Sequence, residues 1–266
     1  MIFSPRLACA TVGFSLESAN VVGYNTTTVA ADQFYMVGVQ LADVGSTTET
    51  ADFNTFLTTT CTPGIYGDGS DGTMGNAPMI QVLQPNGKFY DFYYYISDAD
   101  DGNGNYTATG WVDNLGFNIT ESAAQALSKG FWFKSATAGT LTCAGQVSTL
   151  NSFVRDVPAG QFEIVANPYP VALNLNDPTT SGFTPGTYGD GSDGTMNNAP
   201  MIQVLQANGK FYDFYYYIND ADDGAGNYTA TEWVDNLGFN ITGTQVPAGQ
   251  AFWIKSDTAG TFTFGL

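Results

Sequence analysis

The chain has 266 residues with 25 Asp and Glu against 7 Lys and Arg, a formal net charge of −18. This excess of negative charge argues against a nucleic-acid partner, because so few cations cannot neutralise a run of phosphates. Hydrophobic residues make up 43% of the chain, which predicts folded domains. No apolar run approaches the ~18 residues that a membrane-spanning helix needs, so we expect no membrane insertion.

Histidine is absent from the sequence. Its absence removes the commonest general base, the commonest zinc ligand and every Ser/His or Cys/His nucleophile arrangement. A pair of carboxylates could still hydrolyse glycosides, but that chemistry needs an acid of raised pKa in a cleft. The clustered aspartates of this chain are expected to lie instead in polar loops, in duplicate. We therefore expect a protein that is not an enzyme.

An internal repeat organises the chain. Residues 62–120 recur almost unchanged as residues 184–242, and looser similarity extends to both sides. Such self-similarity indicates tandem structural units. We expect an N-terminal extension over residues 1–19 and two homologous domains over residues 20–147 and 148–266.

The N-terminal extension has two interpretations. Arg6, the apolar stretch that follows it and the small residues after that resemble a signal peptide with an interrupted apolar core. Alternatively, residues 7–10 form a strand, because Leu-Ala-Cys-Ala resembles Leu-Thr-Cys-Ala at residues 141–144. That strand would be either the first strand of domain one or a strand donated to the edge of a neighbouring subunit.

The predicted elements are almost all strands. Residues 79–84 and 88–96 flank Pro85-Asn86-Gly87, which is typical of a hairpin turn, and Asn208-Gly209 repeats it. One segment, Glu121–Leu127, is predicted to be a short helix. Short strands between Gly, Asp, Asn and Pro turns predict an all-β fold of two β-sandwich domains, jelly-roll or immunoglobulin-like. The remaining predicted strands cover residues 33–41, 131–135, 140–147, 162–166, 252–256 and 261–264.

Two of the three cysteines lie in the first repeat, at positions where the second repeat has phenylalanine. Cys61 aligns with Phe183, and Cys143 aligns with Phe264. We interpret this as one spatial contact, filled by a Cys61–Cys143 disulfide in one domain and by an aromatic pair in the other. The alternative is a pair of small buried hydrophobic residues. A disulfide would indicate an oxidising, extracytoplasmic compartment.

Each repeat carries two Gly- and Asp-rich loops. Clustered carboxylates repel one another unless a cation binds, and Ca²⁺ prefers six to eight oxygen ligands from a chain that Gly lets bend. The spacing is not that of an EF-hand, and solvated turns are the alternative. The candidate calcium ligands are Asp68, Asp71, Asp98, Asp100, Asp101, Asp190, Asp193, Asp220, Asp222 and Asp223.

Aromatic residues alternate along residues 89–95 and their repeat, 211–217. One face of each strand is expected in the core, and the other is expected to stack on sugar rings or to bury against another subunit. Trp132 and Trp253 lie in apolar strands and are predicted to belong to the core. The candidate interface or ligand aromatics are Tyr93, Tyr95, Trp111, Tyr215, Tyr217 and Trp233.

Two phrases carry a resemblance to known proteins: Val-Pro-Ala-Gly-Gln-Phe-Glu-Ile-Val-Ala-Asn-Pro at 157–168, and Gly-Phe-Trp-Phe-Lys-Ser followed by Ala-Gly-Thr at 130–140. The repeat resembles the tandem β-rich domains of uncharacterised bacterial secreted and cell-surface proteins. This resemblance implies an extracellular or cell-surface location and no known activity.

The leading functional hypothesis is an extracellular structural protein whose copies assemble into a filament or surface layer stabilised by calcium. It follows from the missing catalytic groups, the duplication and the aromatic faces. The alternative is a calcium-dependent carbohydrate-binding module in which Tyr and Trp stack on glycans. A viral tail or capsid-decoration protein also suits the β-rich composition, although no particular residue indicates it.

Overall fold

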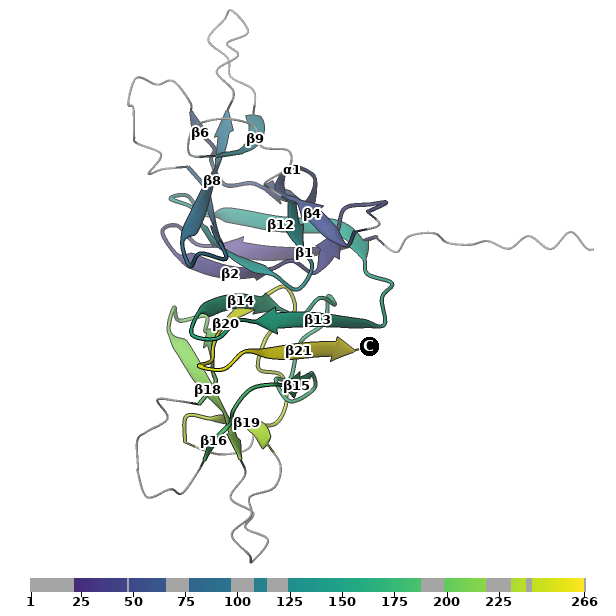
Figure 1. The fold of residues 1–266 in the computed structure, drawn as a ribbon. Coiled ribbons are helices and arrows are strands. Elements are labelled where there is room, and N and C mark those ends of the chain that lie inside the picture. Colours follow the sequence, from purple (N-terminus) through teal and green to yellow (C-terminus); the bar gives the residue numbers. More distant parts are fainter. Residues whose placement is uncertain are drawn as a thin grey trace, which may run out of the picture.

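The computed structural model describes residues 22–46, 48–65, 77–96, 108–113, 124–187, 199–218, 231–237 and 241–265. Within these ranges the only helix is α1 (Phe53–Phe56), and the other regular elements are strands in mostly antiparallel sheets. The all-β prediction is confirmed. Figure 1 shows the two repeats stacked on one another, with β8 and β18 directed toward opposite ends of the molecule.

The first repeat contributes strands to three sheets. The largest has the order β2 (Phe34–Gly38), β11 (Gly130–Lys134), β7 (Met79–Leu83), β8 (Phe89–Ile96) and β6 (Gly64–Ile65), with β9 (Ala108–Asp113) also on β8. The second has the order β1 (Val22–Val29), β12 (Gly139–Val147) and β3 (Leu41–Ala42), with β5 (Leu57–Thr59) on β12. The third pairs β10 (Ala124–Ala126) with β4 (Thr50–Asp52).

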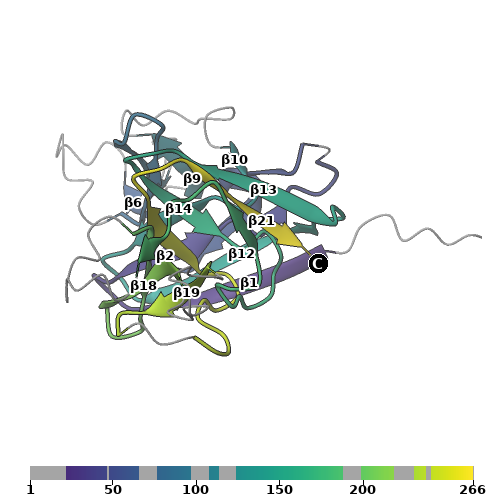
Figure 2. The same ribbon diagram turned by 60° about the horizontal axis from the view of Figure 1, so that its bottom comes forward.

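The second repeat builds matching sheets. Its larger sheet has the order β14 (Phe162–Ala166), β20 (Ala251–Lys255), β17 (Met201–Leu205), β18 (Phe211–Ile218) and β16 (Gly186–Thr187), with β19 (Thr231–Asp235) on β18. Its smaller sheet has the order β13 (Ser152–Val157), β21 (Gly260–Gly265) and β15 (Thr179–Ser181). The C-terminal end of β21 and the start of β1 lie on the same side of the molecule in both views (Figures 1 and 2).

The predicted hairpins are confirmed. Gly87 and Gly209 adopt φ values of +76° and +77°, a region that favours glycine. Each glycine N–H donates to the carbonyl three residues before it, at 2.9 Å in both repeats. The local turn chemistry therefore fixes the register of β7 on β8 and of β17 on β18.

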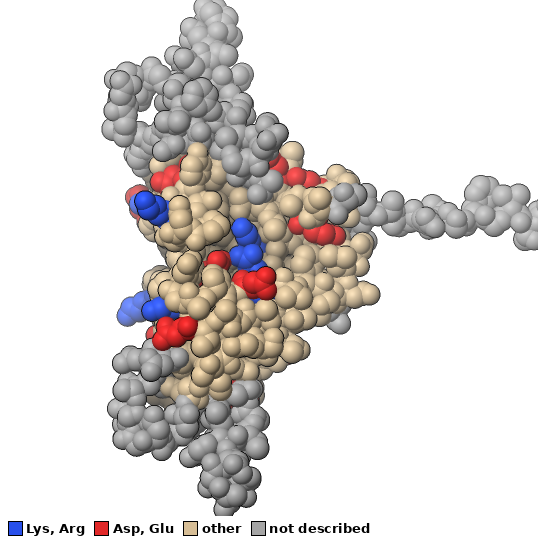
Figure 3. Space-filling view, viewed as in Figure 1, with Lys and Arg blue, Asp and Glu red and all other residues tan. Residues whose placement is uncertain are grey.

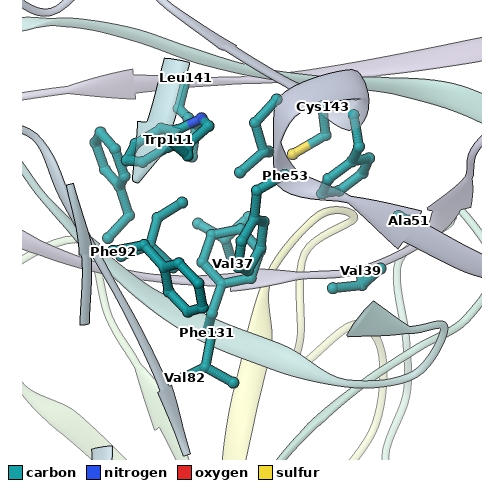
Figure 4. Close-up of a cluster of buried hydrophobic side chains, with 14 of the residues drawn as sticks. Val37, Val39, Ala51, Phe53, Val82, Phe92, Trp111, Phe131, Leu141 and Cys143 are labelled. Carbon is teal, nitrogen blue, oxygen red and sulfur yellow. The ribbon is translucent and has the colours of Figure 1, made fainter. Parts of the chain in front are cut away.

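Each repeat has its own hydrophobic core, formed by side chains from both of its main sheets. In the first core, Phe53 lies edge-on to Phe92 and to Phe131 at centroid distances of 5.3 and 5.2 Å (Figure 4). In the second core, the rings of Trp233 and Phe262 stack at 5.9 Å. Burial of these large rings is the main stabilising contribution of each core.

The helix predicted over residues 121–127 is wrong where the structure describes it, since Ala124–Ala126 is the strand β10. Backbone pairing with Thr50–Asp52 outweighs the helical tendency of a short Ala-rich segment. Sequence analysis missed α1. The Asp52 carboxylate accepts a hydrogen bond from the N–H of Asn54 at 2.8 Å and caps this helix.

The contact between the repeats is reciprocal. The N–H of Gly38 donates to the carbonyl of Gly249 at 2.8 Å, and the N–H of Ala166 donates to that of Ser128 at 2.9 Å. These bonds join corresponding positions of the two repeats. The repeats therefore meet as two copies do across a two-fold axis, with the same patch used on both sides. Four residues of this junction are fully buried: Met36, Ile164, Ala166 and Ala251.

Candidate functional site: the cleft at the junction of the repeats

The outer faces of the two larger sheets meet at the junction. Side chains alternate along a strand, so Phe131 and Phe133 of β11 enter the first core while Trp132 points outward. Trp253 of β20 does the same in the second repeat. Both rings are half-buried. The two tryptophans that were predicted to belong to the core therefore pack against a buried hydrophobic cluster, but that cluster lies between the repeats and not inside either one.

Six rings form one continuous group, which we call the junction aromatic cluster: Phe34, Phe89, Trp132, Phe162, Phe211 and Trp253. Trp132 and Trp253 lie 6.1 Å apart between ring centroids. Each tryptophan also meets a phenylalanine from the opposite repeat edge-on, at 6.1 Å for Phe89–Trp253 and 6.2 Å for Trp132–Phe211. Edge-on pairs of this kind hold the two repeats in a fixed relation.

The cluster remains open to solvent despite these contacts. Its four phenylalanines are each exposed by 40 or 41%. Lys134 lies 5.2 Å from the ring centre of Phe34, and Lys255 lies 5.6 Å from that of Phe162. Five of the six rings, all but Phe162, line a cleft of about 510 Å³. Exposed rings around a concave surface are suited to binding a flat, partly apolar molecule.

Polar side chains continue the outer face beside the cluster. The amide of Gln81 donates to the carboxylate of Asp91 at 3.0 Å, and Gln203 donates to Asp213 at the same distance. Burial raises the pKa of the neighbouring Tyr93, as do the negative charge of Asp91 and the hydrogen bond to it. Burial and Asp213 raise the pKa of Tyr215 in the same way. These tyrosines are therefore neutral at physiological pH.

A second cavity, which we call the β1 groove, opens beside the cleft and has a volume of about 520 Å³. It lies between β1 and β2 of the first repeat and the segment 244–250 of the second, and it shares Gln33, Phe34 and Leu205 with the cleft. Its lining includes amides, hydroxyls and apolar side chains but no charged residue.

The corresponding place in the second repeat carries an ion pair. Arg155 and Glu163, which take the positions of Thr27 and Tyr35, form an ion pair at 2.8 Å. Lys129 lies close to both, and its pKa is lowered by burial and by Arg155. Positively and negatively charged side chains lie next to one another on the surface at the junction of the repeats (Figure 3). The junction is thus symmetric in its backbone and asymmetric in its chemistry.

The predicted aromatic ligands divide into three groups. Tyr93 and Tyr215 are half-buried on the outer faces, and Tyr95 and Tyr217 are buried beside them, each 5% exposed. Trp111, in the first core (Figure 4), and Trp233, in the second, are each 1% exposed. The interpretation of these tryptophans as ligand or interface aromatics is therefore corrected, because their strands turn them inward and leave no ring face for a partner.

The predicted calcium ligands cannot be placed. All ten aspartates lie outside the described residues, as does the N-terminal extension over residues 1–19. In the part of the chain that is described, no group of three or more His, Cys, Asp or Glu residues is arranged to hold a metal ion.

The predicted disulfide is corrected. Cys61 and Cys143 are both buried and both free. Thr59 pairs with Leu141, so Cys61 faces Gly139, and Cys143 lies four residues farther along β12. Four residues of strand span about 13 Å, whereas bridged Cα atoms lie within about 7 Å.

The alignment of these cysteines with phenylalanines has a different meaning. In the second repeat, Phe262 separates Phe183 from Phe264, with centroid distances of 5.6 and 6.0 Å. Leu141 takes the place of Phe262 in the first repeat. The aligned positions are therefore the two ends of a row of three, not the two halves of one contact.

Comparison with protein-family models, with curated proteins and with solved structures found no match. Among the described residues, no helix is long and apolar enough to cross a membrane. The functional argument therefore depends on the junction itself.

Sequence analysis missed this site because its residues come from both repeats. Phe34, Phe89 and Phe211 appear in the sequence as ordinary strand residues. The one available signal was a pair of outward-facing positions, Trp132 and Trp253, within otherwise apolar strands.

Proposed function

We propose that the chain is an extracellular protein that binds carbohydrate in the cleft at the junction of its repeats. The observation that supports this best is the junction aromatic cluster, whose partly exposed rings line a cleft that continues into an uncharged groove. The C–H face of a sugar ring suits the negative face of an aromatic ring. Side-chain amides and hydroxyls are suited to the sugar's hydroxyl groups.

The ligand we propose is a neutral glycan. An acidic glycan would need Lys or Arg to pair with its carboxylates or sulfates, and no cation lines the groove. The excess of negative charge would also repel such a ligand. We also propose that each repeat is a two-sheet sandwich domain, since each has its own core. The acidic loops are proposed to be calcium sites.

The test compares two matched phenylalanines. Phe34 and Phe162 occupy corresponding positions, each lies edge-on to a tryptophan, at 5.8 and 5.4 Å, and each lies beside a lysine. Only Phe34 lines the cleft and the groove. We expect Phe34→Ala to weaken binding to a neutral polysaccharide about tenfold, which corresponds to one lost ring contact.

Phe162→Ala is the control, because it removes the same kind of packing and should change binding less than about twofold. Binding is measured by glycan array and then by calorimetry on the best neutral oligosaccharide. Equal binding by both variants, or no binding of any neutral glycan by the unaltered chain, would contradict the proposal.

The second candidate is the extracellular structural protein that self-assembles. The observation that favours it is the reciprocal junction, because a module that packs on its own copy within one chain is able to pack on a copy in another chain. Exchange of repeats between chains would then produce dimers or filaments. Electron microscopy of the concentrated protein, with calcium and with a chelator, tests this. A chain that remains monomeric in both conditions would reject it.

A further inference from the structure

We propose that the β1 groove is the subsite that determines which glycan binds, and that the chain has one such subsite although it has two repeats. This inference rests on the proposed carbohydrate function and adds the location, number and chemistry of the specific contacts. The reason is the asymmetry at the junction: uncharged Thr27 and Tyr35 line the groove in the first repeat, and the Arg155–Glu163 ion pair stands at the corresponding positions of the second.

The polar groups of the groove are available for a ligand. The side chains of Asn25, Thr27, Gln33 and Thr244 line it, and none of them has a hydrogen-bond partner among the described residues. Amides and hydroxyls that both donate and accept match the hydroxyl groups of a sugar. A ligand that matches these unpaired groups binds better than one that leaves them without a partner, so they determine specificity.

Other groups in the groove are already paired and serve as fixed walls. Gln245 accepts a hydrogen bond from the N–H of Leu175 at 2.9 Å, and the Tyr35 hydroxyl accepts one from the N–H of Ala30 at 2.7 Å. Gln250 donates to the carbonyl of Leu205. Because these walls come from both repeats, the reciprocal junction holds the subsite in its shape before the ligand binds.

The groove and the aromatic cleft form one path for a chain of sugars. Gln33, Phe34 and Leu205 line both cavities. One sugar ring can therefore stack on the cluster while the next presents its hydroxyls to the groove. A ligand of at least two neutral sugar units fits this arrangement, and a monosaccharide would reach only one part of it.

The first experiment uses another pair of corresponding residues. Gln33 and Gln161 occupy the same position in the two repeats, but only Gln33 lines the groove. On the neutral oligosaccharide that binds the unaltered chain best, we expect Gln33→Ala to weaken binding at least fivefold. Gln161→Ala should leave binding within twofold. Equal effects of the two substitutions would overturn the subsite.

The second experiment transfers the ion pair. The double variant Thr27→Arg with Tyr35→Glu introduces into the groove the ion pair that Arg155 and Glu163 form in the second repeat. Because the pair would occupy the subsite, we expect at least a tenfold loss of oligosaccharide binding. Circular dichroism and the melting temperature show whether the variant is folded. If it fails to fold, Thr27→Arg alone is measured in the same way. Retained binding in a folded variant would overturn the inference.

The outcomes separate the two proposals. If the unaltered chain binds no neutral glycan, the carbohydrate function fails and the subsite fails with it. If it binds, and Phe34→Ala weakens binding while the groove variants do not, only the subsite fails. Binding of an uncharged extended peptide but of no oligosaccharide would overturn both in favour of a strand added at the edge of β1.

Discussion

The first and second repeats build the same sheets but fill corresponding places differently. At the junction, the first repeat has Thr27 and Tyr35 where the second has the ion pair of Arg155 and Glu163. In the cores, the row Cys61–Leu141–Cys143 corresponds to a row of three phenylalanines, Phe183, Phe262 and Phe264. The comparison shows that backbone pairing preserves the fold while side chains at corresponding places, in the core as well as at the junction, diverge.

The glycine and alanine residues at the centre of the junction also differ between the repeats. In a symmetric dimer, a residue on the two-fold axis meets its own copy. Here Gly130 faces its counterpart Ala251, and Gly38 faces its counterpart Ala166. A Cβ atom added at Gly130 would lie 2.4 Å from that of Ala251, so the contact has room for one methyl group and not for two. Duplication within one chain allows one copy to be Gly and the other Ala.

The largest expected effect on stability is at the centre of each core row. Phe262→Ala should lower the free energy of unfolding by about 3–5 kcal/mol, because its ring is fully buried and contacts several others. Leu141→Ala, at the corresponding place, should cost about 2–5 kcal/mol. Urea unfolding measures both. A loss below about 1 kcal/mol in either variant would contradict the described core.

An intermediate effect on the free energy of unfolding is expected where the two repeats meet, at Gly130 and Ala251. Gly130→Ala should destabilise the chain by about 1–3 kcal/mol through overpacking against Ala251 and Ile164. Adding Ala251→Gly removes one of these clashes, so the double variant should be more stable than the sum of the single effects predicts. A double-mutant cycle by urea unfolding measures this coupling. Strict additivity would show that the two repeats do not meet as described.

The smallest effect at neutral pH concerns the thiols. Burial raises the pKa of Cys143 from 9.0 to about 12. Because the folded state holds this proton more tightly than the unfolded state, the contribution to stability is complete below pH 9. It is lost as the pH rises toward about 12.

Cys143→Ala should remove this part of the loss of stability at alkaline pH. The free energy of unfolding, measured at several pH values, tests this. Alkylation followed by peptide mass spectrometry should label Cys61 and Cys143 only after unfolding. A peptide pair linked through these two cysteines would contradict the free thiols.

Much of the fold was predictable because its signals are local. The Asn-Gly turns require positive φ and fixed two hairpins, and the alternation of apolar residues identified most of the longer strands. The helix over residues 121–127 was predicted wrongly, because the partner strand of Ala124–Ala126 lies about seventy residues away in the sequence. The predicted pairing of Cys61 failed for the same reason, since it depends on the register of β5 on β12, which lies far away in the sequence.

The sequence by itself determined that the chain is β-rich, duplicated, acidic and without histidine, because composition and local turn chemistry decide these properties. Only the tertiary structure decided that Trp132 and Trp253 meet each other, that the repeats pack reciprocally, and that an uncharged groove lies between β1, β2 and the segment 244–250. The physical reason is that these features arise between two nearly identical halves. Their contact depends on which strand edges meet in space, which the similarity of the halves does not reveal.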